Sequence, residues 1–250
     1  MPYIAVSALS HEGLIRDHNE DSLVIGPWTL CATVTESPQT LLFPLGSPCV
    51  VAVADGLGGH PAGEVASSLT VRRLAATGSG LDSEEAVRAE LRVCNDTLYG
   101  AAAADPDLTG MGTTVAGLVL SGEQVLVFNI GDSQVFEILE EDGKPRLHQL
   151  STDDSPPPPP GRRTTNIVTS TLGGTVAPRE VEPHLRRLPA APGTRYLVCS
   201  DGLTDPVPPE ELAAALDGHD DGRAAFELWR AAIDAGGPDN ITLALVRIDE

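Results

Sequence analysis

The chain has 250 residues, of which 41% are hydrophobic and 21% charged, as in folded globular proteins and unlike disordered ones. Its net charge is −20, so its surface repels nucleic acids and anionic lipids, and we expect neither as a partner. The length allows one large domain or two small ones.

Short segments rich in valine and isoleucine predict β-strands along most of the chain. They are residues 3–7, 22–25, 49–54, 113–120, 124–130, 134–139, 146–150, 195–200 and 241–248. The turn sequence Glu141-Asp142-Gly143 predicts a hairpin between two of these strands.

Apolar residues at helical spacing predict three helices, within 62–69, 87–98 and 226–233. Asp82 or Ser83 is a candidate cap for the second helix. Strands follow one another too directly for repeated βαβ units. The order therefore favours an α+β fold, in which helices cover antiparallel sheets.

The four cysteines, the N-terminus and the hydropathy of the chain bear on its compartment. The cysteines match no zinc-binding spacing, and we expect buried free thiols in a reducing environment. The chain lacks both a secretory signal and a run of ~18 apolar residues. We therefore expect a cytoplasmic monomer that does not enter the membrane.

One low-complexity segment interrupts the chain, at Pro156–Pro160 followed by Gly161-Arg162-Arg163. Five prolines form a stiff, extended segment, which could link two domains. Acidic motifs lie on both sides of this segment, however. We therefore predict a surface loop within a single domain that spans residues 1–250.

Acidic residues occur repeatedly where predicted strands begin or end. Asp55, Asp132 and Asp201 follow strands, whereas Glu20-Asp21 and Asp239 precede them. In antiparallel sheets the end of one strand lies beside the beginning of its neighbour, so all of these acids could gather at one edge. A single Asp-Gly pair is more often a plain turn. Five positions with the same topology favour a metal site.

The donor types indicate which metal such a site would hold. Carboxylates that converge in a partly desolvated site repel one another unless cations neutralise them. Ligation by oxygen alone selects Mg²⁺ or Mn²⁺ and not zinc. Gly56 lets the backbone approach closely, so its carbonyl is a candidate ligand.

Seven motifs, in order along the chain, resemble those of the PPM, or PP2C-like, metal-dependent protein phosphatases, in particular the bacterial members. The segments and the family patterns they resemble are 16–22 (R-x-x-N-E-D-S), 53–60 (V-A-D-G-x-G-G-H), 110–114 (G-x-G-T-T), 129–133 (N-x-G-D-S), 169–173 (T-R-x-L-G), 199–205 (S-D-G-L-T-D) and 239–242 (D-N-I-T). Each motif alone is weak evidence, whereas seven in family order are strong evidence.

The resemblance implies a four-layer αββα sandwich with two Mg²⁺ or Mn²⁺ ions in a cleft at the ends of its two antiparallel sheets. Asp55 would bridge both ions, and the Gly56 carbonyl would bind one of them. Asp201 and Asp239 would complete the shell of the other ion.

The remaining matched positions imply supporting roles. Glu20 and Asp21 would act mainly through bound water. Asp132, together with Asp201, matches a third, weaker metal position of bacterial members. Arg16 would bind the substrate phosphate, since its planar donors hold two oxygens at once.

Several positions depart from the family pattern. His60 ends the second motif, and we expect a structural hydrogen bond there more than a role as general acid. Gln134 and Ser170 replace arginines that are usual in the family. Relatives have D-H-S where this chain has Asp153-Asp154-Ser155, and a helical flap is replaced by the proline-rich loop at about 153–165. Residues 27–48 also exceed a minimal hairpin, with no physical explanation from the sequence.

The expected function is hydrolysis of phosphoserine and phosphothreonine in proteins by water activated at the two ions. Such an enzyme could oppose a bacterial serine/threonine kinase. One alternative is a phosphatase-like module that binds phosphoproteins without turnover. Another is a hydrolase of phosphodiesters or nucleotides.

Overall fold

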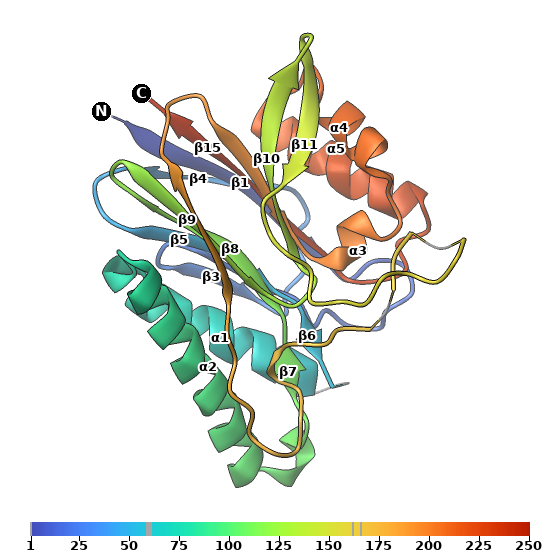
Figure 1. The fold of residues 1–250 in the computed structure, drawn as a ribbon. Helices are drawn as coiled ribbons and strands as arrows, with labels where there is room; N and C mark the ends of the chain where they lie inside the picture. The colour runs from blue at the N-terminus through green and yellow to red at the C-terminus, as the bar shows by residue number, and fades with distance from the viewer. Residues whose placement is uncertain (1, 59–61, 162, 166) are drawn as a thin grey trace.

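The computed structural model describes residues 2–58, 62–161, 163–165 and 167–250, and two six-stranded antiparallel sheets form its centre (Figure 1). The first sheet contains, in spatial order, β11 (Lys144–Gln149), β10 (Gln134–Glu141), β14 (Arg195–Cys199), β15 (Ile241–Asp249), β1 (Tyr3–His11) and β4 (Gln39–Pro44). The second contains β13 (His184–Pro189), β9 (Gln124–Ile130), β8 (Val115–Ser121), β5 (Cys49–Ala54), β2 (Ser22–Ile25) and β3 (Trp28–Cys31).

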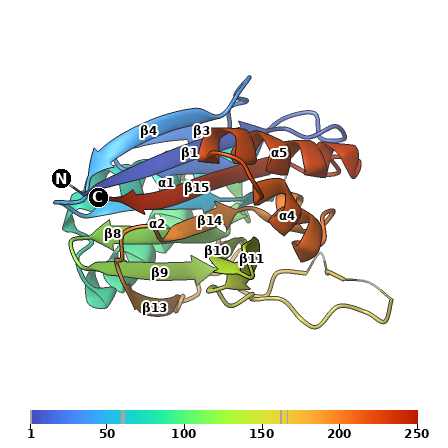
Figure 2. The same cartoon turned by 90° about the horizontal axis from the view of Figure 1, so that it is seen from above.

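Helices cover the outer faces of both sheets, so the molecule has four layers (Figure 2). The long helices α1 (Ala62–Thr77) and α2 (Glu84–Ala104) pack on the second sheet. The first sheet is covered by α4 (Pro209–Leu216) and α5 (Asp221–Asp234), with the one-turn helix α3 (Asp201–Thr204) beside them. The predicted αββα sandwich is confirmed.

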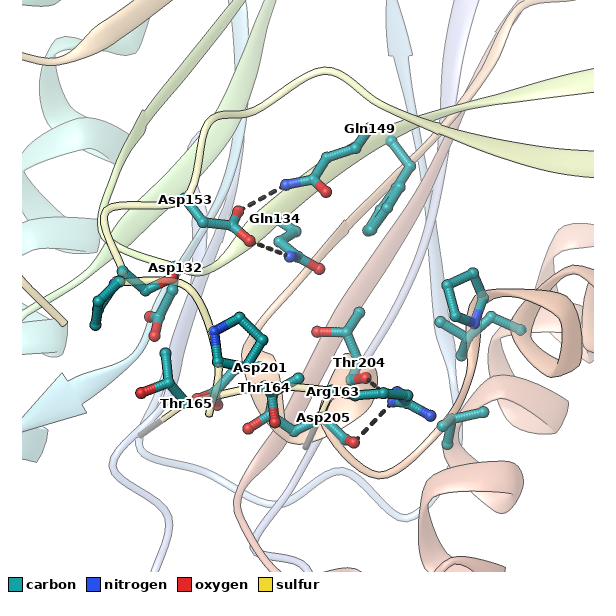
Figure 3. A pocket seen from close by; sticks show the side chains of 17 residues that line it. Asp132, Gln134, Gln149, Asp153, Arg163, Thr164, Thr165, Asp201, Thr204 and Asp205 are labelled. Atoms are coloured by element: carbon teal, nitrogen blue, oxygen red, sulfur yellow. Dashed lines mark hydrogen bonds between the residues drawn. The ribbon is translucent and has the colours of Figure 1, made fainter. Parts of the chain in front are cut away.

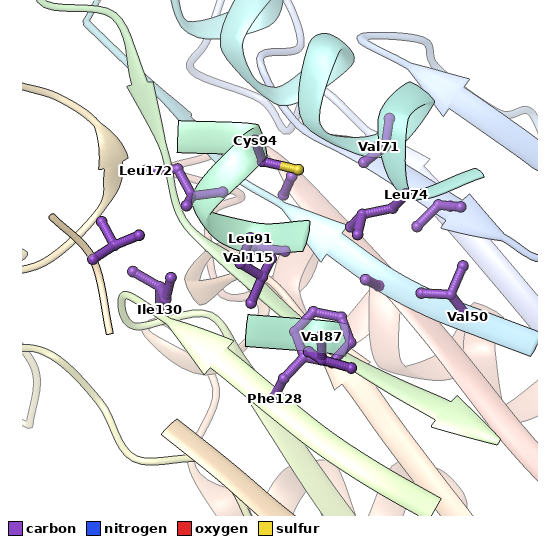
Figure 4. Close-up of a cluster of buried hydrophobic side chains, with 14 of the residues drawn as sticks. Val50, Val71, Leu74, Val87, Leu91, Cys94, Val115, Phe128, Ile130 and Leu172 are labelled. Carbon is purple, nitrogen blue, oxygen red and sulfur yellow. The ribbon is translucent and has the colours of Figure 1, made fainter. Parts of the chain in front are cut away.

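The uninterrupted apolar run of β5 reflects burial on both faces of its sheet. Val50, Ala52 and Ala54 lie in the core beneath α1 and α2, of which Figure 4 shows a part. Val51 and Val53 point the other way, into the core between the two sheets. Because side chains alternate along a strand, a strand between two cores needs apolar residues at every position.

Residues 27–48 contribute one edge strand to each sheet, which explains a length that the sequence alone left unexplained. β3 pairs with β2 in the second sheet, and β4 pairs with β1 in the first. The sequence reading missed both strands, as well as β13 and α4. It also predicted one strand over 113–120, where the structure has the short β7 (Gly112–Thr113) and then β8. β7 joins β6 (Gly56–Leu57) and β12 (Leu172–Gly173) in a small third sheet.

The local predictions about the hairpin turn and the helix cap are confirmed, and the prediction about the thiols is confirmed for three of the four cysteines. Asp142 and Gly143 both have positive φ, as a two-residue type I′ hairpin requires. Ser83 caps α2 by accepting a hydrogen bond from the Ala86 amide at 3.2 Å, so Ser83 and not Asp82 is the N-cap. All four cysteines are free, and Cys49, Cys94 and Cys199 are buried as expected, whereas Cys31 is only partly buried. Within the ranges that the structure describes, none of the helices combines the length and apolarity that a membrane crossing needs.

Candidate active site

Strand register brings the predicted acidic residues to one end of both sheets. In the second sheet Ser22 of β2 lies opposite Ala54 of β5, so the adjoining Asp21 and Asp55 are neighbours. In the first sheet the end of β14 lies beside the start of β15, where Cys199 pairs with Leu243. This register places Asp201 near Asp239. The two sheets meet face to face, so the two pairs of carboxylates converge.

Asp55 lies at the centre of this group. Burial, followed by the negative charges of Asp21, Asp201 and Asp239, raises its pKa well above the usual value for an aspartate. Its backbone is fixed by Thr114, whose amide donates to the Asp55 carbonyl at 2.9 Å. A carboxylate in such surroundings is stable only when it is protonated or neutralised by a cation.

Asp21 is fully buried, and only one of its two carboxylate oxygens has a hydrogen-bond donor. Ser200 donates its hydroxyl to Asp21 Oδ2 at 2.8 Å, whereas Asp21 Oδ1 has no partner among the described residues. Burial raises its pKa to about 7, and the charge of Asp239 adds to the effect. Ser200 is oriented in turn by the Thr242 amide, which donates to its hydroxyl at 3.1 Å.

Asp201, like Asp21, has a buried carboxylate oxygen without a hydrogen-bond donor among the described residues. Its Oδ1 atom is buried and, within the described part of the chain, accepts no hydrogen bond. Burial raises the pKa of Asp201, and the charges of Asp132 and Asp205 raise it further. Unsatisfied buried carboxylate oxygens are costly, and a divalent cation would satisfy them. This donor set therefore fits hard cations such as Mn²⁺ or Mg²⁺.

The described carboxylates lie near one another but do not form a complete coordination shell for an ion. Within the described residues, no three side chains of the His, Cys, Asp or Glu type form a complete cation-binding group. Side chains alone would therefore supply only part of a coordination shell. Mg²⁺ characteristically keeps several waters when it binds proteins, which agrees with an open arrangement of this kind.

The backbone at Gly56 is packed so closely that no side chain fits there. A Cβ on Gly56 would collide with the carbonyl oxygen of Gly63, and it would lie 2.7 Å from the carbonyl oxygen of Glu20. A Cβ on Gly63 would likewise collide with the Glu20 carboxylate. These glycines let α1, the start of β6 and the Glu20 segment meet beside Asp55. The Gly56 carbonyl thus lies next to the acidic group.

Glu20 is held at the edge of the group by Asn240. The Glu20 amide donates to Asn240 Oδ1 at 2.8 Å, while Asn240 Nδ2 donates to the carbonyls of Glu12 and His18 at 3.0 and 2.9 Å. Asn240 therefore ties the Glu20-Asp21 segment to the start of β15. Sequence reasoning included Asn240 in a motif but gave it no role. Its position next to Asp239 was the available signal.

Arg16 lies at the solvent-exposed side of the group and contacts Asp239. Its Nη2 atom donates to Asp239 Oδ2 at 2.7 Å, and the Arg16 side chain remains 53% exposed. The hydrogen bond to Asp239 raises the pKa of Arg16, and the charges of Asp55 and Glu20 contribute. An exposed guanidinium that interacts with three carboxylates supplies positive charge to an otherwise acidic site.

Asp132 follows β9 and faces a different part of the group. Burial raises its pKa to about 6, with further contributions from the charges of Asp205 and Asp153. Its loop is fixed by Asp154, which accepts from the Gly131 amide at 2.9 Å and pairs with His184 Nε2 at 2.8 Å. Asp154 stands where relatives have the histidine of D-H-S. Sequence reasoning noted this departure but did not find its partner on β13.

The proline-rich loop borders Asp132 and Asp201, since Pro156 and Pro158 line the same pocket as these two aspartates. Figure 3 shows the following residues Thr164 and Thr165 beside Asp201. Within 151–171, the residues that the structure describes form neither helix nor strand. The expectation for His60 falls outside the described residues.

Gly202 offers a direct test of how closely the site is packed. A Cβ at this position would overlap the carbonyl oxygen of Asn240, a backbone atom that cannot easily move. We expect Gly202→Ala to destabilise the fold by about 1–3 kcal/mol, because overpacking displaces backbone. Gly100, exposed in α2 with open space around it, is the control. Gly100→Ala should stabilise by about 0.5–1 kcal/mol. Urea unfolding of both variants measures the difference, and equal stability would contradict the close packing.

The chain is similar in sequence to bacterial phosphatases. Residues 44–237 match the family model of protein phosphatase 2C. The serine/threonine protein phosphatase PstP of Mycobacterium tuberculosis is 33% identical in an alignment of 261 positions that covers 97% of this chain and 44% of PstP. The chain thus spans less than half the length of that relative. The serine/threonine phosphatase Stp of Listeria monocytogenes is 32% identical in an alignment of 253 positions that covers 95% of this chain and 93% of Stp.

Solved structures agree with the sequence comparison. A crystal structure of Mycobacterium tuberculosis PstP superposes with a TM-score of 0.80 at 30% identity, covering 99% of this chain and 100% of that one. The catalytic domain of PstP in complex with two manganese ions superposes with a TM-score of 0.77, also at 30% identity and over the whole of both chains. On its sequence and its fold, the chain belongs to the protein phosphatase 2C family.

Proposed function

We propose that this chain is a metal-dependent phosphatase that hydrolyses phosphoserine and phosphothreonine in proteins. The observation that carries the proposal is the partly buried group formed by Asp21, Asp55, Asp201 and Asp239, in which Asp21 Oδ1 and Asp201 Oδ1 are buried and lack any donor among the described residues. The named activity of the relatives and the two manganese ions of the PstP catalytic domain support the same conclusion.

Asp55 would bind both cations. The Gly56 carbonyl would bind one of them, and Asp201 and Asp239 would bind the other. When bound, the ions would supply a water nucleophile at neutral pH and neutralise charge on the phosphoryl oxygens. Glu20 and Asp21 would orient water around them. Asp132 with Asp201 would offer a third, weaker position.

Arg16 would bind the substrate phosphate. Its partner Asp239 is also a candidate cation ligand, and Arg16 is exposed enough to turn from one anion to another. A cation on Asp239 would weaken that ion pair, leaving the guanidinium for two phosphate oxygens. The same residue would thus partner Asp239 before the cations bind and the phosphate afterwards.

The other structural roles follow from the hydrogen bonds. Asn240 and Ser200 would hold the Glu20-Asp21 segment in place, so that acidic groups from both sheets face the same point. We further propose that residues 1–250 act as one domain, as a cytoplasmic monomer that acts on phosphoproteins, including those made by a bacterial serine/threonine kinase.

The experiment is hydrolysis by the purified chain with Mn²⁺, with Mg²⁺ and with a chelator. The substrates are a phosphothreonine peptide, p-nitrophenyl phosphate and bis-p-nitrophenyl phosphate. We expect turnover of both monoesters with either cation, little turnover of the diester, and none with the chelator. Turnover that survives the chelator would overturn the mechanism, and a strong preference for the diester would favour a phosphodiesterase.

A phosphoprotein-binding module without turnover is the second candidate. Loss of the candidate cation-binding residues would signal such a module, whereas Asp55, Asp201 and Asp239 are all present and close together. Calorimetric titration with Mn²⁺, run beside the assay, distinguishes the two. Binding of Mn²⁺ and phosphopeptide with no release of phosphate would establish the binding module.

A further inference from the structure

A cavity of about 430 Å³ lies between the proline-rich loop, β10 and the α3–α4 segment, and we name it the loop-side cavity. Figure 3 shows its lining. Its volume falls in the range of ~300–1,000 Å³ that is usual for ligand-binding pockets. Asp132 and Asp201 belong both to its wall and to the candidate active site. A substrate whose phosphate occupies that site would therefore place neighbouring residues in the cavity.

The base of the loop-side cavity is apolar. Phe136, Val207 and Leu212 contribute side chains to it, and all three also belong to the core beneath α4 and α5. Pro156 and Pro158 form part of its wall. Proline segments are stiff, so this wall loses little entropy when a ligand binds. The apolar surface suits the methylene stem of a long side chain.

The charge of the loop-side cavity is negative. Four aspartates line it, Asp132, Asp153, Asp201 and Asp205, while Arg163 is the single cationic residue among the described residues of its lining. Arg163 donates Nη2 to the carbonyls of Thr204 and Asp205, both at 2.9 Å. Those hydrogen bonds hold the loop against α3 and direct the guanidinium towards the backbone.

Asp153 keeps its negative charge available to a ligand. Its Oδ2 accepts from Gln134 Nε2 at 2.7 Å, and its Oδ1 accepts from Gln149 Nε2 at 2.6 Å. These neutral amides orient the carboxylate without neutralising it. Cations at the active site would neutralise Asp132 and Asp201. Asp153, in contrast, forms no ion pair with a cationic side chain among the described residues.

We propose that the loop-side cavity is a specificity pocket that binds an arginine or lysine side chain close to the phosphorylated residue of the substrate. The proposal rests on the proposed function and specifies its substrate class. The stem of the basic side chain lies on Phe136 and Pro158, and its charged group pairs with Asp153. In an extended peptide, side chains two residues apart lie on the same side about 6.6 Å from each other, so only certain positions reach the cavity.

The test uses the full chain with Mn²⁺ and a set of phosphothreonine peptides. Alanine is replaced in turn by arginine, lysine, leucine or glutamate at each of the positions flanking the phosphothreonine. We expect arginine and lysine at one position to raise kcat/KM about fivefold over alanine, which corresponds to about 1 kcal/mol for a partly exposed ion pair. Glutamate at that position should lower it.

Asp153→Asn should reduce this ratio to about one, since the asparagine keeps the shape and the glutamine amides can turn to preserve their hydrogen bonds. Glu140→Gln is the matched control, because Glu140 is exposed on β10 outside the cavity lining and its replacement removes the same charge. The control should retain the wild-type ratio. Arg163→Ala, which frees the loop from α3, gives a second variant if Asp153→Asn folds poorly, and it should also lower the ratio.

The outcomes separate the two proposals. Hydrolysis of p-nitrophenyl phosphate without any preference for basic residues would overturn the specificity pocket and leave the phosphatase function standing. A preference for leucine at the same position, or a basic preference that survives both Asp153→Asn and Arg163→Ala, would also overturn it. Failure to hydrolyse every monoester would overturn the function and the pocket together.

Discussion

Asp55→Asn is expected to abolish metal-dependent hydrolysis and, in the absence of metal, to make the fold more stable. The loss of activity should reach about 10³-fold or more, because about 4 kcal/mol of charge stabilisation in the transition state corresponds to that factor. Asp239→Asn should also reduce the metal-dependent activity. Measurement of kcat/KM with p-nitrophenyl phosphate and saturating Mn²⁺ tests the activity.

The gain in stability follows from the electrostatics of the metal-free site. Burial and the charges of neighbouring aspartates disfavour the ionised form of Asp55, so its carboxylate destabilises the fold at neutral pH. Asparagine has nearly the same shape without the charge. Thermal unfolding in a chelator should therefore give a higher Tm for Asp55→Asn than for the wild type.

Asp17→Asn is the matched control, because Asp17 is an exposed carboxylate in the segment that carries Arg16. It should change neither kcat/KM nor the Tm appreciably. Wild-type activity in both Asp55→Asn and Asp239→Asn would end the proposed mechanism. A lower Tm for metal-free Asp55→Asn would show that the carboxylates do not repel one another as their positions indicate.

The stability of the metal-free protein is expected to fall as the pH rises from about 4 to about 7. The pKa values of Asp132 and Asp21 are raised in the fold to about 6 and about 7, from an unfolded value of 3.8. The folded state therefore binds protons more tightly than the unfolded state. This contribution to stability is fully present below the unfolded pKa and is lost as the pH passes the folded pKa values.

Addition of Mn²⁺ should reverse this loss at neutral pH. A ligand present at 100 times its Kd stabilises the folded state by about 2.7 kcal/mol, which raises the Tm of a chain of this size by about 5–10 °C. The effect should shrink as the pH falls below about 6, because protons compete with the cation for the carboxylates. Differential scanning calorimetry from pH 4 to 8, with chelator or with Mn²⁺, measures both trends. Two results would contradict the acidic site. One is a Tm in chelator that rises from pH 5 to pH 7, and the other is a Tm at neutral pH that does not change when Mn²⁺ is added.

The internal strands, and the placement of the acidic residues at one end of the sheets, could be predicted because both depend on residues close together in the sequence. β5 must be apolar at every position to lie between two cores, and the Asp142-Gly143 turn can adopt the left-handed conformations that its hairpin needs. The rule that antiparallel strands begin where their neighbours end then brought Asp21 beside Asp55 and Asp201 beside Asp239.

Of the four edge strands of the two large sheets, β11 was predicted together with its hairpin turn, whereas β3, β4 and β13 were not. β13 contains two exposed arginines, and β4 is largely exposed, so neither shows the apolar pattern of an internal strand. Charged and polar residues are usual on edge strands, where they prevent further pairing. The missed helix α4 did carry a signal, since Pro209 precedes Glu210 and Glu211 in its first turn.

The sequence by itself determined which residues are acidic at strand ends, and hence that they would share one edge of the sandwich. Only the tertiary structure decided that Asn240 connects Glu20 to β15, that His184 pairs with Asp154, and that the proline-rich loop encloses the loop-side cavity. Periodicity and turn chemistry act between residues a few positions apart. Hydrogen bonds between residues 30 or 220 positions apart depend on where the whole chain places them.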